Sequence, residues 1–299
     1  MRILISGSHG LVGSALTKSL QSQGHEVLAL VRYTPQYGSD EIEWSPDRYS
    51  IALARLEGFD SVIHLAGESI AAGRWTEAKK KAIRDSRVRG TQLLSETLAS
   101  LRRRPKSFLC ASAIGFYGNR GDEILSETNA PGHDFLATVC VEWEKASAGA
   151  AENGIRTVNL RFGVILNAQG GALAKMLPPF RMGIGGKVGS GKQWMSWIAL
   201  DDAVTAIEFV LSNETLNGPV NLVTPNAVSN AEFTSTLGRV LGRPTLFPIP
   251  AFGARLAFGE MADALLLASQ RVHPTRLLEA GYAFHYPELP GALSHILRQ

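Results

Sequence analysis

The sequence predicts an α/β fold of the Rossmann type, a doubly wound parallel sheet with a smaller, mostly helical C-terminal cap. Three observations predict it. Short apolar runs, typical of strands buried on both faces, alternate with amphipathic helical segments over the first two thirds of the chain. A glycine-rich turn follows the first apolar run and opens the first helix. After about residue 165 the sequence becomes rich in glycine and proline and then mostly helical.

The elements of the first two thirds follow from apolar runs and helical spacing. Runs of apolar residues bounded by turn signals predict strands at 3–5, 27–31, 61–65, 107–111 and 156–160. Apolar residues at helical spacing predict helices at 11–23, 75–102 and 135–152. These helices end at Gly24, before Pro105 and at Asn153 with Gly154, as helix-stop signals require. This alternation is expected to form a Rossmann domain, residues 1–165.

The remaining residues, 166–299, are expected to supply a substrate loop and the helical cap. Residues 167–193 are rich in Gly and Pro, and a long irregular stretch in a compact protein is usually functional or mobile. Helices are predicted at 201–212, 229–241, 252–268 and 274–280. An apolar run at 220–223 predicts a strand, so segments near 195–225 are expected to return to the Rossmann domain.

Composition excludes several classes of protein. Hydrophobic residues make up 45% of the 299 residues and charged residues 19%, which is globular rather than disordered. The net charge of +3 comes with no dense basic stripe, so no nucleic-acid partner is expected. No apolar run reaches about 18 residues, and a strand-like segment begins at Arg2, which predicts neither a membrane partner nor a signal peptide. Two cysteines and scattered histidines suggest a cytoplasmic protein without a metal site. An oligomer is possible, but its interface is not readable.

The glycine-rich turn at residues 7–13, here called the 7–13 turn, predicts a dinucleotide site. Gly7 allows the tight turn after the strand, Gly10 lets the backbone approach a pyrophosphate, and Gly13 lets the helix pack closely on the sheet. Free N–H groups at the helix N-terminus would meet the phosphates. The other expected contacts in this turn are Ser8, His9, Leu11 and Val12. A glycine turn can also be purely structural, but strand, turn and helix occur here in the order that the motif requires.

The end of the second strand favours NADP(H) over NAD(H). NAD-binding proteins usually place an Asp or Glu there for the ribose hydroxyls. This chain ends the strand with Val31 and Arg32, and has no acidic residue before Asp40. An arginine at this point suits a 2′-phosphate by bidentate contact and can stack on adenine. The alternative is that Arg32 is an ordinary surface residue.

Four segments resemble those of extended short-chain dehydrogenases/reductases. Residues 60–67 are similar to the D-x-V-x-H-x-A motif of that family's fourth strand, and 111–118 to its fifth-strand segment ending in Tyr-Gly. Residues 161–164 resemble the loop that meets the nicotinamide, and 197–202 a stretch ending in Asp-Asp. The resemblance implies NADP(H) binding. It adds as cofactor contacts Leu65, Ala66, Gly67, Arg87, Arg161, Gly163 and Val164.

The chain is most similar to one branch, the YfcH-like epimerase family proteins, which carry a small C-terminal helical domain. The similar segments are 66–68, 143–144, 177–180, 189–193, 269–274 and 280–284. Together with the motifs above, they extend the resemblance over nearly the whole chain.

One departure from the wider family concerns the reaction. That family uses Tyr-x-x-x-Lys, in which the Lys lowers the pKa of the Tyr that transfers a proton. None of the six tyrosines has a Lys four residues later, and Leu136 and Cys140 stand roughly where the pair belongs. The resemblance instead leaves Ser112 and Tyr117, after the fifth strand, as candidate catalytic residues that polarise a substrate carbonyl. A packing role for Tyr117 is an equal alternative.

The expected function is that of an NADP(H)-binding oxidoreductase or epimerase-like enzyme. Its substrate would be a small carbonyl compound, a sugar nucleotide or a related molecule, which the sequence does not identify. Candidate substrate contacts are Glu68, Gln193 and Trp197, although the tryptophan can equally belong to the core. Because the Tyr-Lys pair is missing, the alternative is a non-catalytic NADP(H)-binding regulator or scaffold, for example one linked to cell division.

Overall fold

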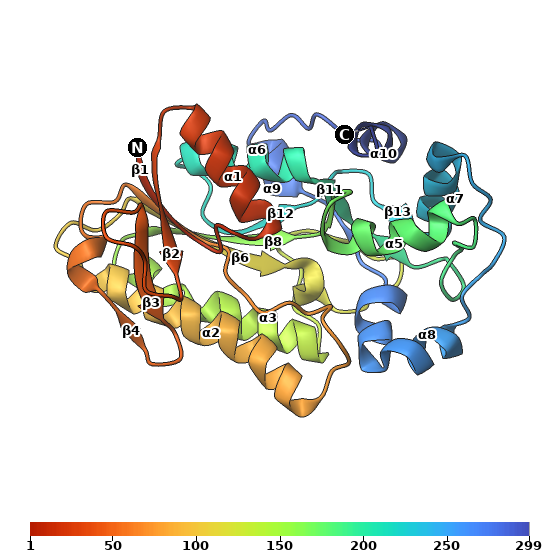
Figure 1. Ribbon diagram of the computed structural model, residues 1–299, viewed down its shortest axis with the longest axis horizontal. Helices are drawn as coiled ribbons and strands as arrows, with labels where there is room; N and C mark the ends of the chain where they lie inside the picture. The colour runs from red at the N-terminus through yellow and green to blue at the C-terminus, as the bar shows by residue number, and fades with distance from the viewer. Residues whose placement is uncertain (299) are drawn as a thin grey trace.

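A computed structural model describes residues 1–298 and contains a twisted eight-stranded sheet (Figure 1). Its strands are β1 (Arg2–Ser6), β2 (Glu26–Val31), β3 (Glu41–Ser45), β4 (Ser50–Ile51), β5 (Ser61–His64), β6 (Ser107–Ala113), β8 (Arg156–Phe162) and β12 (Gly218–Leu222). Their spatial order is β12-β8-β6-β5-β1-β2-β3-β4, and all neighbours are parallel except β3 and β4. Strand order reverses between β1 and β5, which is where open α/β sheets form a ligand crevice.

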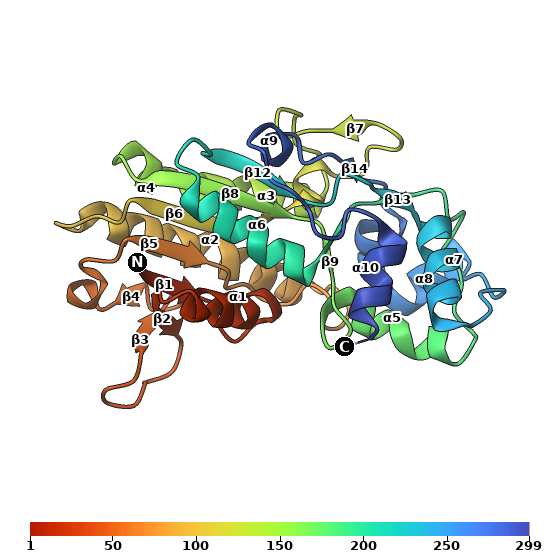
Figure 2. The same ribbon diagram turned by 90° about the horizontal axis from the view of Figure 1, so that it is seen from above.

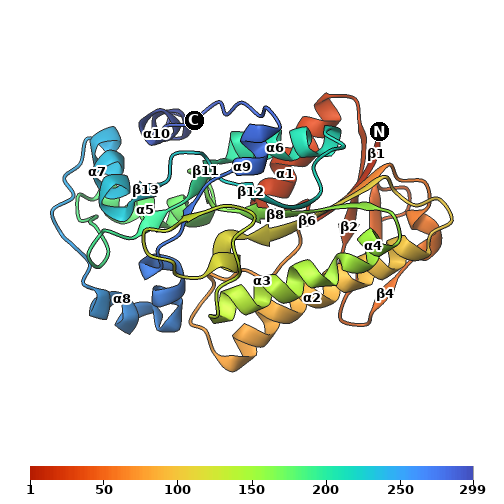
Figure 3. The ribbon, with the colours of Figure 1, turned by 180° about the vertical axis from the view of Figure 1, so that it is seen from behind.

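Helices cover both faces of this sheet, as Figure 3 shows from behind. One face carries α1 (Leu11–Ser22), α6 (Leu200–Ser212) and α9 (Thr275–Glu279). The other carries α2 (Glu77–Ser100), α3 (Phe135–Ala146) and α4 (Ala148–Glu152). The central strands are therefore buried on both sides, which explains their continuous apolar sequence. The predicted doubly wound α/β fold is confirmed.

The C-terminal part lies at the end of the molecule away from β2 and β3 (Figure 2). It contains α5 (Gly171–Arg181), α7 (Asn230–Leu241), α8 (Ala251–Phe258), a π-helical turn (Ala262–Leu267) and α10 (Leu289–Ile296). Three two-stranded ladders connect it to the sheet. They are β9 (Val164–Leu166) with β11 (Trp197–Ala199), β10 (Trp194–Met195) with β13 (Val228–Ser229), and β7 (Ile124–Leu125) with β14 (Arg271–Val272). Single 3-10 turns lie at Leu53–Leu56 and Ile114–Tyr117.

Several elements differ from the sequence prediction for local reasons. The helix expected at 135–152 is divided at Ser147, whose hydroxyl donates to the Glu144 carbonyl and to Asn159. The helix expected at 252–268 is interrupted at Gly259, where φ is +63°. The segment expected to be irregular, 167–193, contains α5, whose buried residues recur at helical spacing although two prolines lie inside it. The strand β3 and the helix α10 were not predicted.

Among residues 1–298, no helix is both long and apolar enough to cross a membrane. In the same part of the chain, no group of three or more His, Cys, Asp or Glu side chains is placed to hold a metal ion.

Candidate functional site

The 7–13 turn sits at the point where the strand order reverses, between β1 and β5. Gly7 adopts φ +74°, and a Cβ atom there would lie 2.8 Å from the Ala66 nitrogen on the loop after β5. A Cβ atom on Gly13 would lie 2.1 Å from the Gly7 carbonyl oxygen. Gly10 donates to that same carbonyl at 2.9 Å and begins α1 without a side-chain cap. The first amides of α1 are therefore left without a side-chain acceptor, in a cradle that fits a dinucleotide phosphate.

The remaining residues of the turn differ in exposure. His9 and Gly10 are exposed, Leu11 and Val12 are half-buried, and Ser8 is buried. A residue that sequence reasoning missed, Gly170, also borders this cradle, because a Cβ atom there would lie 3.0 Å from Leu11 Cδ1. The loop before α5 therefore covers the start of α1. Nothing in its sequence signals this contact, which depends on the path of the chain after β9.

The carboxyl end of β2 places Arg32 at the rim of the same crevice. Val31 is buried at the end of the strand, while Arg32 and the adjacent Tyr33 are exposed. The rings of Tyr33 and His9 lie 6.5 Å apart, so the end of β2 and the 7–13 turn border one space. The Arg32 guanidinium is thus exposed at a position where it can meet a phosphate.

The loop after β5 holds Glu68 next to this rim. Lys79 donates to Glu68 Oε1 at 2.6 Å, and this bond holds the pKa of the Glu68 carboxyl below its usual range, with smaller contributions from the charges of Arg32 and Arg87. Arg87 donates to the Glu68 carbonyl at 2.9 Å and packs over the ring of Trp143. Leu65 and Ala66 are half-buried, and Gly67 is exposed beside the Arg87 guanidinium.

The carboxyl ends of β6 and β8 carry a buried polar network in place of the missing Tyr-Lys pair. Ser112 Oγ donates to Glu144 Oε1 at 2.7 Å. Arg161 binds both carboxylate oxygens of Glu144, each at 2.8 Å, and its side chain is 3% exposed. Arg161 also donates to the Tyr117 hydroxyl at 2.9 Å and stacks 3.5 Å above the ring of Phe116. A charge buried this deeply needs such a bidentate partner.

The network continues beneath Tyr117. The Tyr117 hydroxyl donates to Asn221 Oδ1 at 2.8 Å, and the backbone N–H of Asn221 donates to Glu127 Oε1 at 3.0 Å. Tyr117 is fully buried, and this burial raises the pKa of its phenol. Within the described residues, Glu127 Oε2 has no hydrogen-bond partner. The phenol thus acts as a link inside the protein, and its predicted catalytic role stays untested.

The sequence identified three members of this network, Ser112, Tyr117 and Arg161. It did not identify their partners Glu144, Asn221 and Glu127. Glu144 was available as part of the Trp-Glu pair on the third long helix. Asn221 and Glu127 lie 94 residues apart in contact with each other, and no local pattern signals such a pairing.

Cys140 and Leu136 occupy the place of the family's missing pair. Both pack against Gly115, at 3.7 Å for the sulfur and 3.4 Å for Leu136 Cβ from the position a Gly115 Cβ atom would take. Burial, with the nearby charge of Glu144, raises the pKa of the Cys140 thiol to about 12. Such a thiol stays protonated and is a poor nucleophile.

Gln193 and Trp197, predicted as substrate contacts, have structural partners. Gln193 Nε2 donates to the carbonyls of Val188 and Leu266, and its side chain is buried. Trp197 is fully buried in the C-terminal core and donates to the Asn226 carbonyl. For this tryptophan the structure favours the core interpretation. Because the side chains of Gln193 and Trp197 are both buried, their exposure does not support contact with a substrate, and both assignments remain predictions.

Gly163 and Val164 follow β8. A Cβ atom on Gly163 would lie 2.7 Å from the Ser196 carbonyl oxygen, and Val164 pairs with Trp197 in the short ladder of β9 and β11. The close approach of Ser196 is therefore one reason for a glycine here, independent of any cofactor.

Comparison with known proteins agrees with this geometry. Residues 3–222 match the model of the NAD dependent epimerase/dehydratase family, and residues 249–296 match a domain of unknown function, DUF1731. The chain belongs to the NAD dependent epimerase/dehydratase family. The predicted resemblance to epimerase family proteins is thereby confirmed.

Relatives within the family are similar over almost their whole length. Epimerase family protein Mb2239 of Mycobacterium bovis is 43% identical over 98% of this chain and 96% of its own. Epimerase family protein SDR39U1 of Homo sapiens is 36% identical over 99% of this chain and 100% of its own.

Solved structures include close matches. The crystal structure of human SDR39U1 (isoform 2) with NADPH has a TM-score of 0.92 and 34% identity, covering 100% of both chains. A nucleoside-diphosphate sugar epimerase from Corynebacterium glutamicum has a TM-score of 0.81 and 39% identity over 99% of this chain and 58% of its own. NADPH is thus bound by a member of the family with the same fold.

Proposed function

We propose that the chain binds NADPH at the 7–13 turn and acts as an oxidoreductase or epimerase-like enzyme on a small carbonyl compound or sugar nucleotide. The observation that carries the proposal is the cradle formed by Gly7 and Gly13 against the loop after β5, which leaves the start of α1 open. The NADPH in the structure of human SDR39U1 supports it, because that chain has the same fold over its full length.

NADPH is favoured over NADH by the side chain at the rim. Arg32 is exposed at the end of β2, and its charge also acts on the Glu68 carboxylate beside the same crevice. A guanidinium binds phosphate bidentately, whereas a ribose 2′-hydroxyl offers it no charge. Arg32 should therefore contribute to the affinity for NADPH and little to the affinity for NADH.

The residues that would handle a proton are Ser112 and Glu144. The bound cofactor would supply the hydride chemistry, as a hydride donor when reduced and a hydride acceptor when oxidised. Ser112 directs its hydroxyl hydrogen to Glu144, so it offers lone pairs to a ligand. In the oxidative direction, a substrate hydroxyl would donate its proton to Ser112 Oγ as Ser112 passes its own proton to Glu144, while Arg161 fixes the position of the carboxylate. Reduction of a carbonyl would run the same proton transfers in reverse. Tyr117 would hold Arg161 from beneath rather than contact the substrate.

Titration of the cofactor-free protein with NADPH and NADH, followed by tryptophan fluorescence, tests the proposal. The wild type should bind NADPH more tightly, and Arg32→Ala should weaken NADPH binding about tenfold while leaving NADH binding within twofold. Arg48→Ala, at another exposed arginine, is the matched control and should change neither. Equal binding of both cofactors by wild type and Arg32→Ala would contradict the role of Arg32.

The second candidate is a regulator that binds NADP(H) without turnover. The burial of the polar network favours it, because Ser112 is 2% exposed and Tyr117 is fully buried. A screen of carbonyl compounds and sugar nucleotides for NADPH oxidation separates the two functions. Turnover that is lost in Ser112→Ala supports the enzyme. A protein that binds NADPH normally and oxidises it with none of these compounds supports the regulator.

A further inference from the structure

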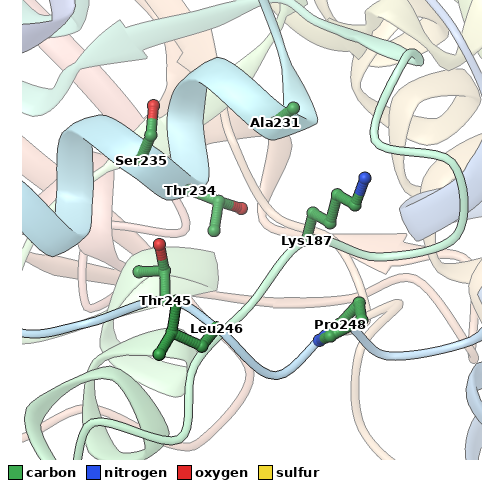
Figure 4. A pocket seen from close by; sticks show the side chains of 7 residues that line it. All are labelled: Lys187, Ala231, Thr234, Ser235, Thr245, Leu246 and Pro248. Carbon is green, nitrogen blue, oxygen red and sulfur yellow. The ribbon is translucent and has the colours of Figure 1, made fainter.

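A small pocket lies in the C-terminal part beside α7, the helix that lies at the end of the molecule away from β2 and β3 (Figures 1 and 2). It has a volume of about 230 Å³. Its walls are α7 on one side and the segments around Lys187 and Thr245 on the other (Figure 4). The lining residues used here are Lys187, Ala231, Thr234, Thr245, Leu246 and Pro248.

The walls of this pocket are fixed by backbone contacts. The Ile249 amide donates to the Lys187 carbonyl, and the Val188 amide donates to Asn230 Oδ1, both at 2.8 Å. A Cβ atom on Gly238 of α7 would lie 2.4 Å from Thr245 Cγ2, so α7 reaches this segment only because residue 238 is glycine. The pocket is thus set by the fold, and its shape does not depend on flexible side chains alone.

Polar groups without partners face the pocket. Thr234 is 4% exposed, and its hydroxyl is directed toward the Lys187 side chain (Figure 4). Within residues 1–298, neither the Thr234 hydroxyl nor the Lys187 ammonium has a hydrogen-bond or ion-pair partner. The Thr234 hydroxyl is not among the fully buried polar atoms that lack a partner, so it is accessible to a ligand in the pocket. An ammonium with adjacent hydroxyls is suited to a phosphate.

The surrounding charge is one-sided. Between residues 153 and 200 and between 231 and 259, Glu232 in the first turn of α7 is the one acidic residue, whereas Arg181, Lys187, Lys192 and Arg243 are exposed in these stretches. Their field favours an anion in the pocket.

Large apolar side chains are exposed beside the pocket. Leu246, which lines it, is 76% exposed, and Phe247, the next residue in the chain, is 59% exposed. Apolar residues exposed together, with polar residues at their edge, mark sites of interaction. The pocket is also smaller than the 300–1,000 Å³ of sites that enclose a whole ligand, so it has room for a head group only.

We propose that this pocket binds the phosphate head of an amphiphile, whose apolar part lies on the exposed side chains of Leu246 and Phe247. Lys187 supplies the positive charge and Thr234 a hydrogen bond. The amphiphile can come from two sources, a free phosphorylated molecule with an acyl or isoprenoid chain, or the surface of an anionic bilayer. The absence of a spanning segment in the sequence does not bear on binding to a bilayer surface.

Binding of dihexanoyl phosphatidate below its micelle concentration, measured by titration calorimetry, tests the proposal. Saturable binding should weaken about tenfold in Lys187→Gln and severalfold in Thr234→Val. Lys192→Gln, which removes an exposed neighbouring charge that does not line the pocket, should stay within twofold. The affinity for NADPH should be unchanged in all three variants, and this measurement serves as the control that they fold.

Two further arms identify the source and the role of the apolar part. The protein can be sedimented with phosphatidylcholine vesicles that contain one third phosphatidate. If it co-sediments and Lys187→Gln does not, the source of the amphiphile is the bilayer surface. Binding of the short-chain lipid without binding to vesicles assigns a free amphiphile. Inorganic phosphate should bind at least tenfold more weakly than dihexanoyl phosphatidate. Equal binding of the two, no saturable binding of the lipid, or equal losses in Lys187→Gln and Lys192→Gln would overturn the proposal.

Discussion

Replacing Glu144 with glutamine should test whether the buried network holds the ends of β6 and β8 together. The change keeps the shape of the side chain but removes the charge that compensates Arg161, which is 3% exposed and bound at both carboxylate oxygens. Breaking a buried ion pair by removing one partner costs about 3–5 kcal/mol. Because the Glu144 side chain is still 14% exposed and glutamine can accept one hydrogen bond, the lower end, about 3 kcal/mol, applies.

The same helix offers a matched control. Glu142 pairs with Arg84 at 2.5 Å, but these side chains are 34% and 48% exposed, and exposed pairs contribute about 0–1 kcal/mol. With an unfolding entropy of about 2.1 cal/mol/K per residue, a 299-residue chain should lose about 5 °C of Tm in Glu144→Gln. Glu142→Gln should lose about 1 °C or less. Differential scanning calorimetry measures both, and equal losses would refute the argument that burial makes the Glu144 pair important.

Two further predictions concern buried polar groups. Burial lowers the pKa of His64 to about 3, so between its ordinary value of 6.5 and pH 3 the unfolded chain takes up a proton that the native protein does not. The free energy of unfolding should therefore fall by about 2 kcal/mol between pH 7 and pH 5. Urea titrations at several pH values measure this fall, and the contribution of His64 should be missing in His64→Asn. Tyr117→Phe removes a hydroxyl that donates to Asn221 and accepts from Arg161, and should cost about 1–3 kcal/mol of stability with no change in NADPH affinity. A variant of normal stability with impaired ligand binding would instead place the phenol in contact with a ligand.

Local patterns in the sequence predicted what depends on local chemistry. The 7–13 turn and the buried strands follow from the spacing of glycines and apolar residues, and both are present in the fold. The helix α5 was missed because Gly and Pro content was weighed above the helical spacing of Leu173 and Leu177, whose burial in the C-terminal core stabilises the helix.

The polar network could be predicted only in part. Ser112 and Arg161 were found through the family resemblance, and the structure pairs them at the ends of adjacent parallel strands. Their partner Glu144 comes from a helix, and which of its faces meets the sheet depends on the packing of α3 against β6. The pairing of Asn221 with Glu127 depends on β12 joining the edge of the sheet beside β8. Such contacts are set by tertiary structure, and no local pattern carries them.

The central claim, a dinucleotide at the 7–13 turn, is tested most directly by NADPH titration of Gly10→Ala. A Cβ atom at residue 10 would meet the protein only at the Gly7 carbonyl, at 3.2 Å, so the variant should fold. Its methyl group would occupy the place where a pyrophosphate approaches the start of α1. Gly291→Ala, in a helix with open space around the added methyl, is the control. The account predicts at least tenfold weaker NADPH binding in Gly10→Ala and none of this loss in Gly291→Ala. Unchanged binding in a folded Gly10→Ala protein would contradict it.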